Sequence, residues 1–153
     1  MNFREIIKAW LPVVLWMVLM FFGSTDLMSA EHTSRFLTPF LRWLNPDISP
    51  AAIAQVHFLV RKAAHVTEYA ILTGLLFRAL RGLMGGFWWR AAVALVSAMI
   101  FAAADEFHQT FIPSRTGSIY DILVDYCGAL TGILICRMLV LRWRDSKHDD
   151  RIA

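Results

Sequence analysis

The chain has 153 residues, of which 58% are hydrophobic and 18% are charged. Soluble domains average roughly 45–50% apolar and about 25% charged residues, so this composition favours a membrane protein. The length allows a single domain, residues 1–153. The net charge of +3 does not indicate a nucleic-acid partner, because the basic residues gather at the ends of apolar stretches, as they do in membrane proteins.

Apolar stretches predict an all-α membrane protein with four transmembrane helices, over about residues 6–22, 58–80, 87–111 and 119–141. The first stretch follows Arg4 and Lys8, as the apolar part of a secretory signal does. Cleavage after Ala30 would require a small residue where Met28 stands, so we expect this first helix to be retained.

A short interfacial helix is expected between the first and second spans. Apolar residues recur there at helical spacing, at Phe36, Leu37, Phe40, Leu41 and Leu44. This pattern is typical of a helix lying on the membrane surface, and Pro39 is expected to delay its start until Thr38. Packing against the other helices explains the pattern equally well. Ser49 and Pro50 then predict the N-cap and first position of the second span's helix.

The positions of lysine and arginine predict the orientation of the four spans. Basic residues flank the N-terminus, the connection between Arg78 and Arg90, and the C-terminal tail. These three segments fall on one side of a four-span protein, so we expect both termini in the cytoplasm. The polar tail, residues 142–153, is expected to fray.

Polar residues inside the spans follow one face of each helix. By helical spacing these faces contain Lys62, His65, Glu68 and Tyr69; Asp105, His108 and Gln109; and Asp121, Asp125, Gly128 and Gly132. Counted from the basic ends, Asp105 lies about 22 Å deep, Glu68 about 15 Å and Asp125 about 25 Å. A charge facing lipid at such depth costs about 2.5–3.5 kcal/mol, so the three faces are expected to meet inside the bundle.

Several of these residues have structural explanations as well. Asp121 follows Ser118 at capping-box spacing and would then only start the fourth helix. The Gly-x-x-x-Gly formed by Gly128 and Gly132 is typical of close helix packing. Arg61 and Arg137 are expected to extend along their helices to the interface.

The polar motifs resemble those of a known family. Lys62-x-x-His65-x-x-x-Tyr69, then Asp105-Glu106-x-x-Gln109-x-Phe111-x-Pro113-x-Arg115, Asp121, Gly128 and Gly132 are similar to the VanZ-like family. The resemblance implies a small multi-pass protein of the bacterial cytoplasmic membrane, in a family whose namesake is associated with resistance to the glycopeptide teicoplanin. It implies no chemical mechanism, and the chain carries Asp125 where the family usually has asparagine.

Binding of an anionic cell-envelope molecule is the first functional hypothesis. Arg115 precedes a helix N-terminus, where backbone N–H groups also favour an anion. The partner would be a lipid headgroup or a cell-wall precursor, bound near the extracytoplasmic side. The candidate ligand-binding residues are Lys62, His65, Glu68, Tyr69, Asp105, Glu106, Gln109, Arg115, Asp121 and Asp125.

Two other functions use the same residues. A hydrolase or transferase acting on a lipid-linked substrate would use His65, Asp105 and Glu106 as catalytic residues, with His65 as the general base. A metal-dependent variant would use these three residues and His108 as ligands, although no established ligand spacing is matched. A small proton-coupled transporter is the third hypothesis, and four spans would be few for it unless the chain forms a homo-oligomer.

Overall fold

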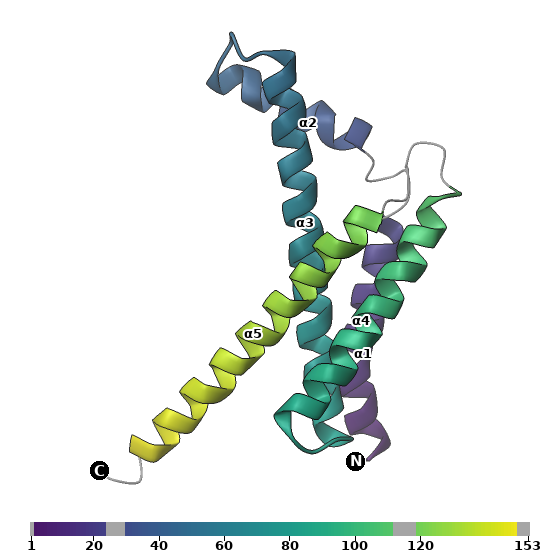
Figure 1. Cartoon of the computed structure of the whole chain (residues 1–153), viewed down its shortest axis with the longest axis vertical. Helices are drawn as coiled ribbons and strands as arrows, with labels where there is room; N and C mark the ends of the chain where they lie inside the picture. Colours follow the sequence, from purple (N-terminus) through teal and green to yellow (C-terminus); the bar gives the residue numbers. More distant parts are fainter. Residues whose placement is uncertain (1, 24–29, 112–118, 150–153) are drawn as a thin grey trace.

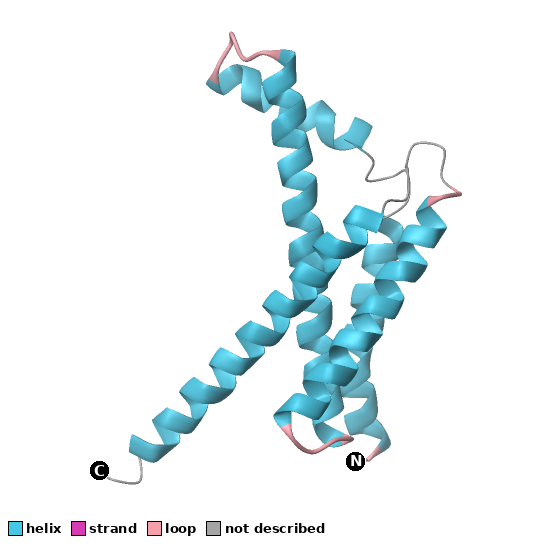
Figure 2. Cartoon of the chain, viewed as in Figure 1, coloured by secondary structure: helices cyan, strands magenta, loops and turns pink. Residues whose placement is uncertain are grey.

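The computed structural model describes residues 2–23, 30–111 and 119–149, and most of them are helical. The α-helices are α1 (Phe3–Gly23), α2 (Ala30–Leu44), α3 (Pro50–Ala79), α4 (Phe87–Gln109) and α5 (Ile119–Asp149). A short 3₁₀ helix, η2 (Leu80–Gly82), continues α3. Figure 2 shows short loops between α2 and α3 and between η2 and α4, and no strand occurs within the described ranges.

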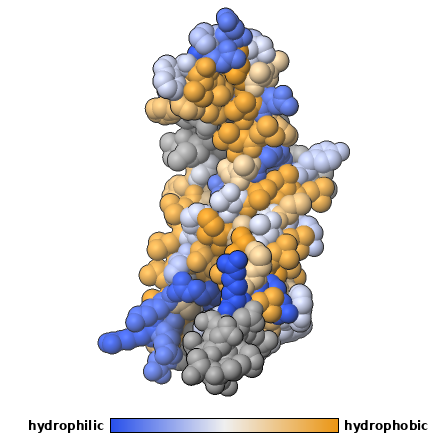
Figure 3. All heavy atoms as spheres, turned by 90° about the vertical axis from the view of Figure 1, so that its left-hand side faces the viewer, coloured by the Kyte–Doolittle hydropathy of each residue, from blue (hydrophilic) through white to orange (hydrophobic). Residues whose placement is uncertain are grey.

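Three helices are long and apolar enough to cross a membrane: α1, α4 and the Tyr120–Trp143 part of α5. They correspond to the first, third and fourth predicted spans. The second predicted span lies in α3, which is not among the three because polar and charged side chains interrupt its apolar sequence. On the face of the molecule drawn in Figure 3, hydrophobic residues cover the middle and hydrophilic residues gather mainly at the two ends.

Helix α3 is the centre of the arrangement. It begins as its sequence predicts, with the Ser49 side chain accepting a hydrogen bond from the backbone N–H of Ala52 and with Pro50 at the first position. It contacts α1, α2, α4 and α5. On the α1 side, the indole N–H of Trp16 donates to the Glu68 carbonyl at 3.0 Å. Several polar residues of α3, among them His65, Tyr69 and Thr73, are buried in this arrangement.

Helices α3 and α5 run in the same direction and approach closely at two glycines. A Cβ atom at Gly128 would lie 2.5 Å from the carbonyl oxygen of Val66, and one at Gly132 would lie 2.4 Å from that of Ala70. Only a residue without a side chain fits at either position. Small residues also form the packed face of α4, which is buried at Ala91, Ala94, Ala98 and Ala102. The Gly-x-x-x-Gly therefore has the close-packing role that its spacing indicates.

Both termini lie at one end of the molecule, together with the connection between α3 and α4 (Figure 1). The α2 helix and the start of α3 lie at the opposite end. This arrangement agrees with the grouping of the three basic segments predicted from the sequence. It places the polar residues of α3 between the two ends.

Two local expectations were wrong. Helix α2 does not wait for Thr38 but starts at Ala30 and contains Pro39. A proline inside a helix removes one backbone hydrogen bond, and a helix that continues on both sides of it can accommodate that loss as a kink. The tail does not fray at residue 142 either, because α5 continues to Asp149.

Candidate functional site

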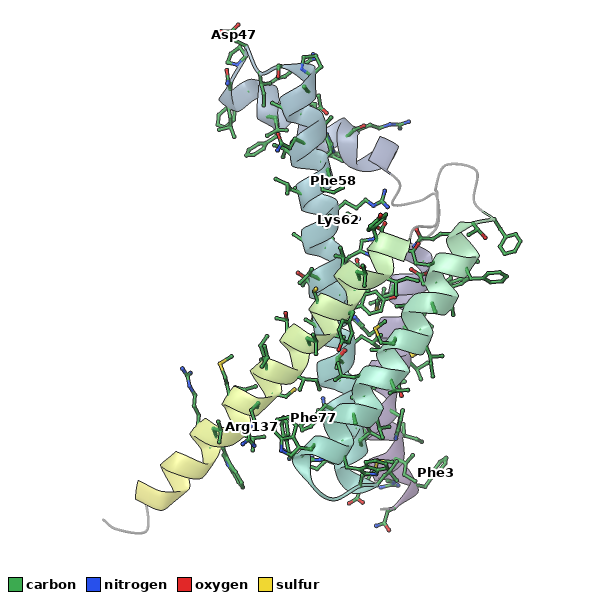
Figure 4. All side chains as sticks on the ribbon, viewed as in Figure 1. Phe3, Asp47, Phe58, Lys62, Phe77 and Arg137 are labelled. Carbon is green, nitrogen blue, oxygen red and sulfur yellow. The ribbon has the colours of Figure 1, made fainter. Side chains whose placement is uncertain are left out.

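Two cations of α3 pair with one carboxylate of α5. Arg61 Nη2 lies 2.8 Å from Asp121 Oδ2, and Lys62 Nζ donates to the other oxygen, Asp121 Oδ1. The Asp121 side chain is only 5% exposed, whereas those of Lys62 and Arg61 are 20% and 43% exposed. Figure 4 shows Lys62 beside the start of α5. Asp121 is therefore engaged between the helices and not only in starting α5, and its predicted cap, Ser118, lies outside the described residues.

One turn deeper, His65 pairs with Asp125. His65 Nδ1 lies 2.9 Å from Asp125 Oδ1, and the two side chains are 9% and 1% exposed. The second carboxylate oxygen, Asp125 Oδ2, is buried and has no hydrogen-bond partner among the described residues. The same α3–α5 contact thus joins a cationic outer part to a buried histidine–aspartate pair.

Helix α4 adds a third polar face at this depth. Asp105, Glu106 and Gln109 are all buried, and the Gln109 side-chain amide donates to Asp105 Oδ2 at 2.9 Å. On the α3 side, Tyr69 is buried, and its ring lies 6.4 Å from that of Phe101, one turn before Asp105 on α4. The polar faces of α3 and α4 therefore lie next to each other in the interior.

The remaining predicted residues occupy different places. Glu68 is half-buried on α3, between His65 and Tyr69 on the one side and Trp16 of α1, which donates to its carbonyl, on the other. His108 is not part of the cluster, because its ring packs on Phe21 of α1 with the centroids 4.6 Å apart. Arg115 lies outside the described residues.

Sequence reasoning missed two members of this face. Arg61 was expected only to extend to the interface, yet it pairs with Asp121. Thr73 is fully buried, and its hydroxyl has no hydrogen-bond partner within the described ranges; the same is true of the Tyr69 hydroxyl. The spacing contained the signal, since residues 61, 65, 69 and 73 recur every fourth position and share one helix face.

The chemistry available in this cluster is that of acids, a histidine and two cations. Among the described residues, no group of three histidine, cysteine, aspartate or glutamate side chains is arranged to hold a metal ion. The outer part can attract an anion, and the deeper carboxylates and hydroxyls can accept or donate hydrogen bonds to a polar group.

These features define the protein as a helical membrane protein with a polar cluster enclosed between its helices. A family model described as VanZ/LLP1 matches residues 9–141, and the chain belongs to this family. No curated protein and no solved structure matches the chain. The resemblance seen in the polar motifs is thereby confirmed.

Proposed function

We propose that α1, α3, α4 and α5 all cross the bacterial cytoplasmic membrane as one domain, with both termini in the cytoplasm. The distribution of side chains on α3 supports a fourth span. Its residues Lys62 and His65 form ion pairs with α5, while apolar residues such as Phe58, Leu59 and Ile71 are exposed. A helix with this distribution crosses a bilayer inside a bundle, although its own sequence is not uniformly apolar.

Labelling of single cysteines tests this topology. With Cys127 and Cys136 replaced, Asp47→Cys and Arg81→Cys would introduce a thiol at exposed positions on either side of α3. A membrane-impermeant maleimide should label the Asp47→Cys variant in intact cells and the Arg81→Cys variant only after permeabilisation. Labelling of both in intact cells would show that α3 does not span.

Helix α2 is proposed to lie at the extracytoplasmic membrane surface. Phe36, Phe40 and Trp43 share one of its faces and are exposed, Phe36 by 83% and Trp43 by 76%. Such a face is suited to the boundary between headgroups and acyl chains. A hydrogen bond of 3.1 Å between Thr38 Oγ1 and His57 Nε2 ties α2 to the outer part of α3.

The cluster between α3 and α5 is proposed to bind an anionic envelope molecule from the extracytoplasmic side. The observation that carries this proposal is the Arg61–Asp121–Lys62 arrangement, in which two cations share one carboxylate. Counted over the residues that the structure describes, this arrangement has one more positive than negative charge, and the cations lie on its more exposed side. A guanidinium and an ammonium beside each other suit a phosphate or a carboxylate.

The deeper part of the cluster suits a different portion of the same ligand. Tyr69 and Thr73 have buried hydroxyls without a hydrogen-bond partner among the described residues, and Asp125 Oδ2 is likewise available. Buried polar atoms of this kind are normally satisfied. A hydroxyl-bearing or amino-bearing group next to the phosphate, as in a lipid headgroup or a lipid-linked cell-wall precursor, would satisfy them.

Binding of a lipid phosphate tests this assignment. Farnesyl phosphate, compared with farnesol, isolates the contribution of the phosphate in detergent-solubilised protein. Arg61→Gln should weaken binding of farnesyl phosphate roughly 10-fold, as expected for a charge-assisted hydrogen bond worth about 1.5 kcal/mol, and leave farnesol binding unchanged. Arg42→Gln, which changes an exposed arginine of α2, is the matched control.

Equal affinities for farnesyl phosphate in the wild type and the Arg61→Gln variant would refute the assignment. A contribution to resistance is tested separately, by the teicoplanin tolerance of cells that produce each variant.

A membrane-embedded hydrolase or transferase is the second candidate, because His65 is held by Asp125 as a general base is held by an orienting carboxylate. Nε2 of His65 would take a proton from an attacking hydroxyl or water. The same farnesyl phosphate incubation separates the two functions. For an enzyme, phosphate release should fall at least ~100-fold in the Asp125→Asn variant, the lower range for general-base catalysis, while binding is retained. Absence of release by the wild type would remove this candidate for that substrate.

A further inference from the structure

A second group of cations lies at the opposite end of the bundle, where both termini lie. Arg90 of α4 and Arg137 of α5 each place a guanidinium over aromatic rings. The Arg90 Cζ atom is 4.6 Å from the centroid of Phe77, and that of Arg137 is 5.0 Å from Phe87 and 5.5 Å from Trp88. Phe77 and Phe87 contact each other with centroids 5.0 Å apart. We call these five residues the inner cationic cluster, and Figure 4 labels Arg137 and Phe77 within it.

The inner cationic cluster contains two positive charges and no carboxylate. Neither guanidinium forms an ion pair with a carboxylate in the described part of the chain, in contrast to Arg61 and Lys62. Arg90 donates from Nε to the Gly86 carbonyl at 3.1 Å, and the first turn of α4 contains no acidic residue. A basic residue in the first turn opposes the helix dipole, so Arg90 occupies a place that an anion would stabilise.

Stacking leaves the guanidinium groups able to bind such an anion. An aromatic ring engages the flat face of a guanidinium, whereas its N–H donors point outward from the edge in the plane of the group. Arg137 is half-buried, and its guanidinium lies against Phe87 and Trp88. A guanidinium edge that is held in this way can form two parallel hydrogen bonds to a phosphate.

The cluster lies towards one end of the apolar segments, and its surroundings are typical of a membrane interface. Arg90 is in the first turn of α4, and Arg137 is near the end of the apolar part of α5, Tyr120–Trp143. Trp88 and Trp89 are 70% and 64% exposed, as is typical of side chains at a membrane interface. The exposed Met138 and Leu139 of α5 continue the surface towards the acyl chains.

We infer that the inner cationic cluster binds the phosphate of an anionic phospholipid in the leaflet on the side of the termini. The lipid phosphate meets the guanidinium edges of Arg90 and Arg137, and its acyl chains lie along the apolar surface of α5. Basic pockets between membrane helices recognise anionic headgroups in this way. The site does not depend on the proposed outer site, because Arg61 and Lys62 lie towards the other end of α3.

Native mass spectrometry tests this inference by measuring which lipid the full chain retains on release from detergent. The two lipids compared are phosphatidylglycerol and phosphatidylcholine with the same acyl chains. The wild type should retain phosphatidylglycerol in preference. Arg137→Gln and Arg90→Gln should each lower that preference roughly 10-fold, as expected for a charge-assisted hydrogen bond worth about 1.5 kcal/mol. Arg81→Gln removes the same charge from an exposed residue at the same end. It should leave the preference within about twofold, because an exposed charge that does not contact the phosphate is screened by water.

Two results would overturn the inference. One is an equal retention of both lipids by the wild type. The other is a loss in the Arg81→Gln variant as large as that in the Arg137→Gln variant, since general surface charge would then explain the preference. Helical circular dichroism checks that each variant folds. If Arg137→Gln does not fold, Arg90→Gln and Arg137→Lys test the inference instead. Arg137→Lys keeps the positive charge but loses the planar guanidinium that lies against the aromatic rings, so it should still lower the preference for phosphatidylglycerol.

Discussion

Replacing Asp121 with alanine is expected to lower the free energy of unfolding by about 3–5 kcal/mol, the usual cost of removing one partner from a buried ion pair. The substitution leaves Lys62, which is 20% exposed, without a counter-charge between α3 and α5. Unfolding in mixed detergent micelles, followed by circular dichroism, measures the change.

Two further variants separate the contributions of the cations. Lys62→Met combined with Asp121→Ala should recover at least half of the lost stability, because no buried charge then remains unpaired. Arg61→Ala alone should cost only about 0–1 kcal/mol, since its side chain is 43% exposed and water screens the pair. If the double variant were as unstable as Asp121→Ala, an unpaired Lys62 would not be the cause.

Replacing Gly132 with alanine is expected to destabilise the protein by about 1–3 kcal/mol, as overpacking of a close contact does. The new Cβ would lie 2.4 Å from the Ala70 carbonyl oxygen, which is backbone and cannot turn aside. The two helices would have to separate, and the ion pairs of Asp121 and Asp125 would lengthen with them. The same unfolding measurement applies, and Gly128→Ala should behave alike.

Gly74 provides the matched control. It lies in α3, and its added Cβ would meet only Cys136 Sγ, at the ordinary contact distance of 3.9 Å. Gly74→Ala should therefore stabilise α3, by up to about 1 kcal/mol from helix propensity. The two glycine-to-alanine substitutions are thus expected to differ in sign. A stabilising Gly132→Ala would show that α3 and α5 do not pack as closely as their backbones indicate.

Helical spacing predicted much of the cluster without any tertiary information. Residues 62, 65 and 69 share a face of one helix, as do 121 and 125 of another, because side chains three or four positions apart project from the same side. The capping of α3 by Ser49 was equally local and was confirmed. His108 shows the limit of this reasoning: it follows Asp105 at the right spacing, yet it packs on Phe21 at the margin of the face.

The two wrong predictions, on the start of α2 and on the C-terminal tail, both relied on the preferences of a few neighbouring residues. Pro39 was expected to delay α2, but the helix includes it, since a single missing hydrogen bond does not outweigh those on either side. The polar composition of the tail suggested fraying, yet α5 continues to Asp149, because charged residues such as lysine and arginine are good helix formers. In both cases the cooperativity of the whole helix outweighed the local preference.

The sequence by itself determined that the chain is a helical membrane protein with charge on one face of its spans, because hydropathy and spacing are properties of single segments. Only the tertiary structure decided which charges meet. Gly128 and Gly132 let α5 lie alongside α3 in the same direction, and this register sets Asp121 against Lys62 and Asp125 against His65. Register depends on contacts between segments far apart in the chain, so the periodicity of either helix alone does not contain it.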